Sequence, residues 1–286
     1  MKTILVATDF HNNSESATRM AVALTKQFDA ELTVLHAYHL FPYYTDMYPT
    51  LAEQQFDQLK AEAQTAMLEW CTSHLPADEV MYNPLHLPGL ASDVIIEQTK
   101  KLQPELLVMG TRKTWLIDKV IFGSVAGTVM ADVTCSVLVV PENTEATPLK
   151  KLLYATDFHD SDLDCIRQLV DLAKPSEASL TVLHIVNDQD PDQEFDTSYF
   201  DDFQKEVEEA VNYPHIRFEL VHAENLVESL NTYTQVAEID LLAMAKTGKN
   251  WFARLFSPSI TRKHFYRSTV PTLFFTAVDD ENSTDF

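Results

Sequence analysis

The sequence predicts an α/β protein made of two similar domains, and two observations support this fold class. First, the chain repeats itself once, because Ala7–His11 recurs as Ala155–His159 and Leu32–His36 recurs as Leu180–His184, both at an offset of 148 residues (155 − 7 and 180 − 32). Second, short β-branched runs alternate with segments of helical periodicity in each copy. Strands that alternate with helices form parallel sheets covered on both faces. Each copy is therefore expected to be a doubly wound domain.

The boundary between the copies is expected in Pro141–Pro148, a polar stretch bracketed by prolines. After the two matches at an offset of 148 residues, the offset between the copies changes. Leu106–Met109 matches Leu241–Met244 at an offset of 135 residues (241 − 106). The second copy therefore lacks 148 − 135 = 13 residues between the earlier and the later matches, which predicts a shorter middle helix there. Two copies form two domains and not a solenoid, which needs at least three short repeats. We expect the domains at residues 1–145 and 146–286.

Helical periodicity recurs at equivalent positions of both copies. Ala17, Ala21 and Leu24 fall on one face of the first predicted helix, and Cys165 and Leu169 repeat that face. The second helix is expected to be long in the first copy and shorter in the second. Its side chains expected to point inward are Phe56, Leu59, Ala63, Met67 and Trp70 in the first copy, and Phe200, Phe203, Val207 and Ala210 in the second. The strands of the first copy are expected at Ile4–Thr8, Leu32–Ala37, Met81–Leu87, Leu106–Met109 and Ser136–Val140, with helices from Asn12, at Leu51–Leu75, at Leu90–Leu102 and from Ser124.

The charge of the chain limits its partners. It has 21 basic and 43 acidic residues in 286, a net charge of −22. A surface this negative repels nucleic acid and anionic lipid, so neither is an expected partner. No apolar run approaches the length of a membrane span, and the N-terminus lacks the apolar core of a signal peptide. Three cysteines without CxxC spacing fit a reducing compartment, and we expect a cytoplasmic protein.

One stretch carries a pattern typical of anion binding. Gly110 ends the apolar run Leu106–Met109, and Gly123-Ser124 opens a helix-like segment before the run Ser136–Val140. A strand, a loop and a helix that begins with Gly-Ser present backbone N–H groups to an anion. This spacing resembles the universal stress protein family, whose nucleotide-binding members carry Gly-x2-Gly-x9-Gly-Ser/Thr here. Lys113 stands at the second glycine of that motif.

The resemblance covers nearly the whole chain, twice over, in the order and spacing of the family. It implies that each copy has a five-stranded, mainly parallel sheet of the adenine nucleotide alpha hydrolase-like type. It also implies that the last strands, Ser136–Val140 and Pro271–Phe275, pair within one chain as an internal pseudo-dimer, since an exposed apolar edge strand needs a partner. A homodimer is a further assembly that the resemblance leaves open.

The resemblance also implies a nucleotide site in the first copy. In nucleotide-binding relatives the aspartate after the first strand and the backbone after the second-strand histidine contact the nucleoside, while the glycines and the Gly-Ser pair wrap the phosphates. The expected ligand is ATP with Mg²⁺, and no separate metal site is expected. The implied nucleotide-binding residues are Thr8, Asp9, Ala37, Met109, Gly110, Lys113, Gly123, Ser124 and Val125.

The second copy departs further from the motif. Ala245 replaces the first glycine, Gly248 remains, and Pro258 replaces the glycine before Ser259, which removes an N–H donor. We therefore expect the second copy to be a structural partner. The sequence has no P-loop, nucleophile elbow or HExxH helix, and we expect no catalysis.

Two functional hypotheses follow, with a third ranked last. The chain is expected to be a stress-response binding or regulatory module whose first copy binds an adenine nucleotide and which acts on a protein partner that the sequence does not identify. The alternative is an interaction scaffold in which both pockets have decayed, as Lys113 suggests. Slow ATP hydrolysis ranks last. Simpler interpretations also exist, because Asp9 and Asp157 are common turn residues, and His36 and His184 lie on apolar strands as satisfied core histidines.

Overall fold

The chain folds into two α/β domains. The computed structural model describes residues 1–38, 49–76, 78–111, 113–114, 119–120, 124–187, 197–246 and 270–276. The chain divides into one compact unit of residues 1–113 and 122–146 and a second of residues 114–121 and 147–286. The predicted fold class is confirmed, with one doubly wound sheet in each unit. The pairing of the two last strands in a pseudo-dimer stays a prediction.

The sheet of the first domain is parallel, with the strand order β3-β2-β1-β4-β7. Its central strands are apolar on both faces, as strands buried between two helical layers must be. The predicted strands are present with small changes at their ends. The strands are β1 (Thr3–Thr8), β2 (Glu31–Tyr38), β3 (Tyr82–Pro88), β4 (Leu106–Thr111) and β7 (Ser136–Pro141), while the short β5 (Lys113–Thr114) and β6 (Lys119–Val120) form a separate pair.

The second domain repeats this order as β10-β9-β8-β11-β12, again with parallel neighbours. Tyr154 at the centre of this sheet is fully buried, and Phe274 of the last strand is also fully buried. The strands are β8 (Lys151–Ala155), β9 (Ser179–Asn187), β10 (Ile216–Ala223), β11 (Leu241–Lys246) and β12 (Thr272–Thr276).

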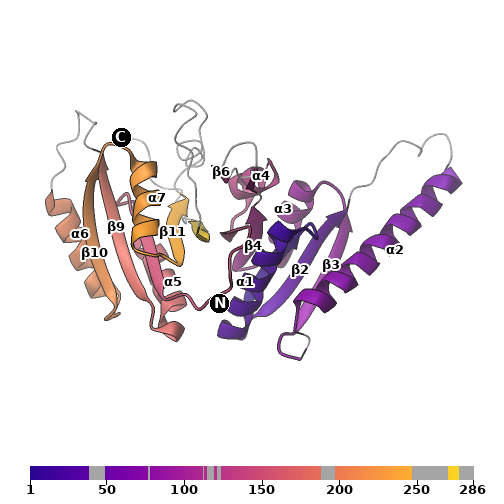
Figure 1. Cartoon of the computed structure of the whole chain (residues 1–286), viewed down its shortest axis with the longest axis horizontal. Coiled ribbons are helices and arrows are strands. Elements are labelled where there is room, and N and C mark those ends of the chain that lie inside the picture. The colour runs from indigo at the N-terminus through magenta and orange to yellow at the C-terminus, as the bar shows by residue number, and fades with distance from the viewer. Residues whose placement is uncertain are drawn as a thin grey trace. The chain divides into compact units, whose positions relative to one another are not determined.

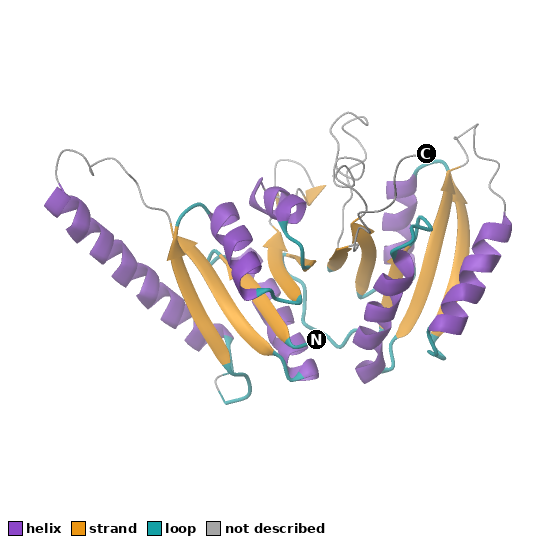
Figure 2. Ribbon diagram, turned by 180° about the vertical axis from the view of Figure 1, so that it is seen from behind, coloured by secondary structure: helices purple, strands orange, loops and turns teal. Residues whose placement is uncertain are grey.

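Helices cover both faces of each sheet, as Figures 1 and 2 show from opposite sides. In the first domain the chain moves from β1 to β2 to β3 in one direction and from β4 to β7 in the other. Because parallel crossovers are right-handed, α1 and α2 lie on one face, and α3 and α4 lie on the other. The helices are α1 (Asn12–Phe28), α2 (Pro49–His74), α3 (Ala91–Leu102), α4 (Ser124–Asp132), α5 (Asp162–Ala173), α6 (Thr197–Ala210) and α7 (Leu226–Val236), with a 3-10 turn at Lys174–Ser176.

Two expected inward positions are wrong, and both lie on the second helix of a copy. Phe56 is 38 % exposed, because α2 has 26 residues and, at about 1.5 Å per residue, extends beyond β3, which has 7 (Figure 1). Ala210 is exposed at the last residue of α6. The expected faces of α1 and α5 are confirmed, since Ala17, Ala21 and Cys165 are all buried. No helix in the described parts of the chain is long and apolar enough to span a membrane.

Candidate functional site

The candidate site lies at the carboxyl ends of β1, β2 and β4. These strands are neighbours, and their register places Ala7 beside Met109 and Thr8 beside His36. Between β1 and β4 the chain leaves in opposite directions, and ligands of doubly wound sheets bind at such a switch point. The structure thus places five predicted site residues at the ends of three adjacent strands: Thr8, Asp9, Ala37, Met109 and Gly110. A sixth, Lys113, follows in β5.

The rest of the predicted site is only partly described. Ser124 and Val125 begin α4, which follows β4 in the chain, so the predicted helix start is present. Lys113 lies in the short strand β5, where an extended backbone accommodates a side chain without left-handed strain. Gly123 of the first copy lies outside the described residues, as do Gly248, Pro258 and Ser259 of the second.

The loop after β1 is ordered by the Asp9 carboxylate. Ser14 donates its hydroxyl to Asp9 Oδ1 at 2.5 Å, and the His11 N–H donates to the same oxygen at 3.2 Å. The Asp9 N–H in turn donates to the Ser14 hydroxyl at 3.0 Å. The N-cap of α1 is His11, which makes no side-chain hydrogen bond to the helix. Ser14 fixes the orientation of Asp9.

A phenylalanine stacks on the second-strand histidine in both copies. Phe10 has φ of 60° and Phe158 has φ of 62°, a left-handed conformation that is uncommon for a bulky residue. Phe10 packs on His36 with ring centroids 3.9 Å apart, and Phe158 packs on His184 at 4.2 Å. In each copy this packing holds the tight turn that leads the chain from the first strand into the next helix.

The two histidines are half-buried, and each has a hydrogen-bond partner within the fold, as expected. His36 Nδ1 lies 2.9 Å from the carbonyl oxygen of Thr8, and His184 Nδ1 lies 2.9 Å from that of Thr156. Burial lowers the pKa of both imidazoles from the ordinary 6.5, opposed by these carbonyls and by the nearby Asp9 and Asp157. Each histidine therefore ties the end of one strand to its neighbour in the neutral form.

These lowered pKa values predict a pH-dependent stability. A histidine whose pKa is lower in the folded state contributes stability that is present above the unfolded value of about 6.5 and lost as the pH falls below it. We expect the free energy of unfolding of the wild type, measured with urea relative to that of His36→Gln/His184→Gln, to decrease from pH 7 to pH 5.

Gly110 is required by the close approach of α1. A Cβ at Gly110 would lie 2.1 Å from the carbonyl oxygen of Asn13 and 2.7 Å from its carbonyl carbon. Real Cβ atoms do not approach backbone so closely, so the start of α1 crosses the end of β4 only because position 110 has no side chain. The sequence suggested contact with a phosphate as the reason for this glycine, and the structure adds an internal one.

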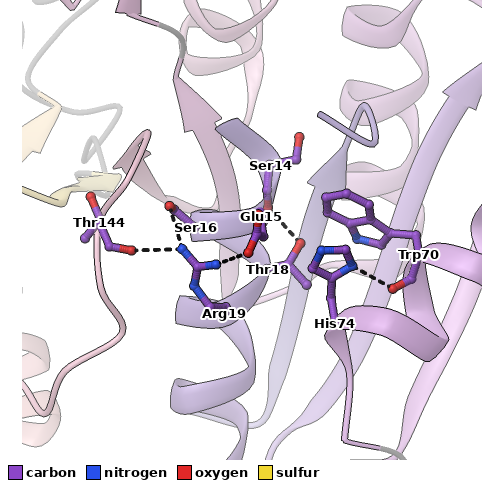
Figure 3. Close-up of polar contacts among 8 residues, drawn as sticks. All are labelled: Ser14, Glu15, Ser16, Thr18, Arg19, Trp70, His74 and Thr144. Atoms are coloured by element: carbon purple, nitrogen blue, oxygen red, sulfur yellow. Dashed lines mark hydrogen bonds and ion pairs between the residues drawn. The ribbon is translucent and has the colours of Figure 1, made fainter. Parts of the chain in front are cut away.

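The first turns of α1 are further held by Arg19, as Figure 3 shows. Arg19 pairs with Glu15, donates to the Ser16 hydroxyl at 3.1 Å and donates to the Thr144 carbonyl at 3.4 Å. The last contact connects α1 to the segment that follows β7. Arg19 thus fixes the first turns of α1, which include the Asn13 backbone that faces Gly110, to the segment after β7.

The second copy replaces the Ser14 hydroxyl by a buried carboxyl group. Asp162 occupies the equivalent position (162 − 148 = 14) and is 1 % exposed. Tyr154 donates its hydroxyl to Asp162 Oδ1 at 2.7 Å, and the Thr156 hydroxyl donates to Oδ2. Tyr154 stands where the first copy has Val6 (154 − 148 = 6), so the second copy has gained an acid and a donor together. Sequence reasoning missed this network, although the aligned repeats contain both differences.

The pKa of Asp162 is raised above its ordinary value of 3.8. Burial is the main cause, and the nearby Asp157 adds to it. The hydrogen bonds from Thr156 and Tyr154 and the charge of His159 act in the opposite direction but do not outweigh burial. Burial also raises the pKa of the neighbouring Cys165 thiol to about 12. An acid in this position disfavours a further negative charge nearby.

The end of β11 in the second domain differs from the end of β4 in the first domain at two equivalent positions. Ala245 takes the position of Gly110 (245 − 135 = 110), and Lys246, which is buried, takes that of Thr111. Ala245 has the Cβ that Gly110 must lack. The helix equivalent to α1 is α5, which begins at Asp162, equivalent to position 14, whereas α1 begins at Asn12. The capping Ser161 has a helical backbone, where His11 is extended.

No group of three or more metal-binding side chains is present in the described parts of either domain. The expected absence of a protein-built metal site stays a prediction, because Mg²⁺ that arrives with a nucleotide needs few protein ligands.

Comparison with known proteins identifies the family. The sequence matches the Universal stress protein family over residues 1–141 and again over residues 148–275. The chain therefore belongs to the universal stress protein family and contains two of its domains in tandem. A universal stress protein of Methanocaldococcus jannaschii is 30 % identical over 141 residues, which is 49 % of this chain and 81 % of that protein. A universal stress protein of Thermus aquaticus is 27 % identical over 139 residues, 49 % of this chain and 98 % of that protein.

Solved structures share the two-domain fold. The crystal structure of a universal stress protein from Archaeoglobus fulgidus matches with a TM-score of 0.71 at 15 % identity. The match covers 96 % of this chain and 97 % of the chain in that structure. At this identity the likeness shows the fold alone. The expected family and fold class are thus confirmed by the sequence match and by the structure.

Proposed function

We propose that this chain is a stress-response regulator whose first domain binds an adenine nucleotide, ATP with Mg²⁺, at the carboxyl ends of β1, β2 and β4. The observation that carries the proposal is that Asp9 and Gly110 lie at the adjacent carboxyl ends of β1 and β4, at the switch point, and that α4 is the next helix in the chain. A doubly wound sheet binds its ligand at such a point. The family resemblance of the Gly-Ser segment supports the same position.

Each element of the site has a physical role in this proposal. Asp9 is oriented by Ser14 and by the His11 N–H, so its carboxylate is ready to accept hydrogen bonds from the nucleoside. The first turn of α4 offers unsatisfied N–H groups and the positive end of the helix dipole to the phosphates. Mg²⁺ and the Lys113 ammonium offset the cost of a polyanion on a chain with net charge −22.

The second domain is proposed to be a structural partner without bound nucleotide. Asp162 places a carboxyl group beside Asp157, where the first domain has the neutral Ser14. Ala245 carries the Cβ that the close approach of α1 forbids at Gly110, and the equivalent helix begins at Asp162. Both changes act against an anionic ligand at this end of the sheet.

The protein is proposed to act by binding and not by catalysis, in the cytoplasm, with nucleotide occupancy changing the surface that a protein partner contacts. A second candidate function, an interaction scaffold without ligand, is favoured by one observation, the lysine at the second glycine of the motif. The two candidates differ in what Lys113 does to the site.

Substitution of Lys113 separates these candidates. If Lys113 contributes charge to the phosphates, Lys113→Ala and Lys113→Gly should both weaken ATP binding about tenfold, because a hydrogen bond to a charged group is worth about 1.5–3 kcal/mol. The measurement is calorimetric titration of nucleotide-free protein with ATP and Mg²⁺. The exposed Lys60 on α2 supplies the control, since Lys60→Ala should leave the affinity unchanged.

The opposite result supports the scaffold. If the wild-type protein takes up no ATP while Lys113→Gly binds it, the lysine closes the site and the nucleotide proposal is rejected. Phosphate release that exceeds that of an Asp9→Ala/Ser124→Ala variant would in turn contradict the proposed absence of catalysis.

A further inference from the structure

A buried hydroxyl group at the end of β4 has no hydrogen-bond partner. Thr111 follows Gly110 at the last position of the strand and is 2 % exposed. Its Oγ1 is one of only three buried side-chain polar atoms without a partner among the residues that the structure describes. The neighbour across the ladder is Pro141, which has no N–H to donate and whose carbonyl oxygen already accepts the Thr144 hydroxyl at 2.7 Å.

An unpartnered hydroxyl at this position is costly. Burial of a polar group without a hydrogen bond destabilises the folded state, and a valine of nearly the same shape would avoid the cost. The neighbouring β4 positions are in fact filled by Leu106, Leu107, Val108 and Met109, all buried and apolar. The hydroxyl therefore has a use that the packing of the strand does not explain.

Strand geometry places this hydroxyl on the face of α4. Successive side chains of a strand point to opposite faces. A Cβ at Gly110 would point to Asn13 in α1, so Thr111 points to the opposite face, which α3 and α4 cover. α4 begins at Ser124 and packs against α3 on that face. A helix that follows a parallel strand begins near the carboxyl end of the sheet, and its first N–H groups have no partner within the helix.

The second domain also places a polar group at this position. Lys246 is equivalent to Thr111 and is 7 % exposed on β11. The same face of the strand end therefore holds a hydroxyl in one domain and an ammonium group in the other. Both groups can donate a hydrogen bond to an anion.

We propose that the Thr111 hydroxyl is a direct ligand of the nucleotide and donates a hydrogen bond to a phosphate oxygen held by the first turn of α4. This inference rests on the proposed nucleotide binding of the first domain and adds a phosphate-binding residue on the second face of the sheet. In this arrangement Asp9 and Gly110 contact the ligand from the face of the sheet that α1 covers, and Thr111 contacts it from the face that α4 covers.

The test compares two substitutions at this position in the full chain. Thr111→Val removes the hydroxyl and keeps the volume, and Thr111→Ser keeps the hydroxyl. Calorimetric titration with ATP and Mg²⁺ should show affinity reduced about tenfold or more in Thr111→Val and within about threefold of wild type in Thr111→Ser. The melting temperature of nucleotide-free Thr111→Val should be equal to or above that of the wild type, because an unpartnered buried hydroxyl is removed.

A residue with a purely structural role would behave differently. If Thr111→Val lowers the melting temperature of the nucleotide-free protein together with its affinity, or if Thr111→Ser fails to retain binding, the inference is overturned. Equal ATP affinity in Thr111→Val and wild type overturns it while leaving the proposed function intact. Absence of ATP binding in the wild type overturns both.

Discussion

Gly110→Ala is expected to abolish ATP binding and to destabilise the first domain by about 2–3 kcal/mol, the range of an overpacked core position. The added methyl group would lie 2.1 Å from the carbonyl oxygen of Asn13, a backbone atom that cannot rotate away. Relief requires displacement of the start of α1, and with it the Ser14 hydroxyl that orients Asp9. Calorimetric titration with ATP and urea denaturation measure the two effects.

The second domain offers the matched control for this substitution. Ala245 already occupies the equivalent position, with a helix that begins later. Ala245→Gly is expected to cost no more than the roughly 1 kcal/mol of a glycine in a strand and to leave ATP binding unchanged. Unaltered ATP affinity in Gly110→Ala would show that the close approach of α1 is not needed for the site.

Asp162→Ala is expected to lower the free energy of unfolding by about 3 kcal/mol, because it removes the acceptor of two buried hydroxyls at once. Tyr154 is 0 % exposed and Thr156 is 7 % exposed, so water does not readily replace the lost carboxyl oxygens. Ser14→Ala in the first domain should cost less, since its partner Asp9 is more accessible. Urea denaturation of both variants compares the two positions.

Asp162→Asn tests the raised pKa of this acid. A carboxyl group whose pKa is raised in the folded state contributes stability that is fully present below its unfolded pKa, about 3.8, and is lost as the pH rises through the folded pKa. The stability of the wild type relative to Asp162→Asn should therefore be greatest near pH 4 and decline toward neutral pH, by at most about 1.4 kcal/mol per pH unit. A difference that grows with pH would mean that the carboxylate, and not the acid, is the favoured form.

Most of the fold could be predicted from the sequence because the repeat supplies each pattern twice. Ala17 and Ala21 alone form a weak helical face, but Cys165 and Leu169 repeat it at the same offset. The predicted strands are apolar on both faces and bounded by polar turns, which is typical of parallel sheets. What periodicity could not predict is how far a helix extends beyond its sheet, and this is why Phe56 was wrongly placed inward.

The candidate site was predictable in position but not in its internal contacts. The order of motifs places Asp9 and Gly110 at the ends of neighbouring strands. The reason for Gly110 depends on the path of α1 across β4, a tertiary contact with no local sequence signal. The paired change from Val6 and Ser14 to Tyr154 and Asp162 was visible in the aligned repeats, yet only burial shows that these residues form one network.

The unpartnered hydroxyl of Thr111 was not predictable at all from the sequence. Threonine is common in strands, and its β-branched shape fits a buried position. Whether its hydroxyl finds a partner is decided by what packs against that face of the strand, a tertiary contact with no local sequence signal. A polar atom that packing leaves unpaired is a signal that only the three-dimensional structure provides.

Calorimetric titration of the wild-type protein tests the central claim most directly. The protein is first unfolded to release and identify any bound nucleotide by chromatography, then refolded or dialysed free of nucleotide and titrated with ATP and Mg²⁺. Saturable binding of one ATP per chain is the predicted result, since only the first domain is proposed to bind nucleotide. Two sites per chain would contradict the role given to Asp162 and Ala245, and no heat at millimolar ATP would contradict nucleotide binding itself.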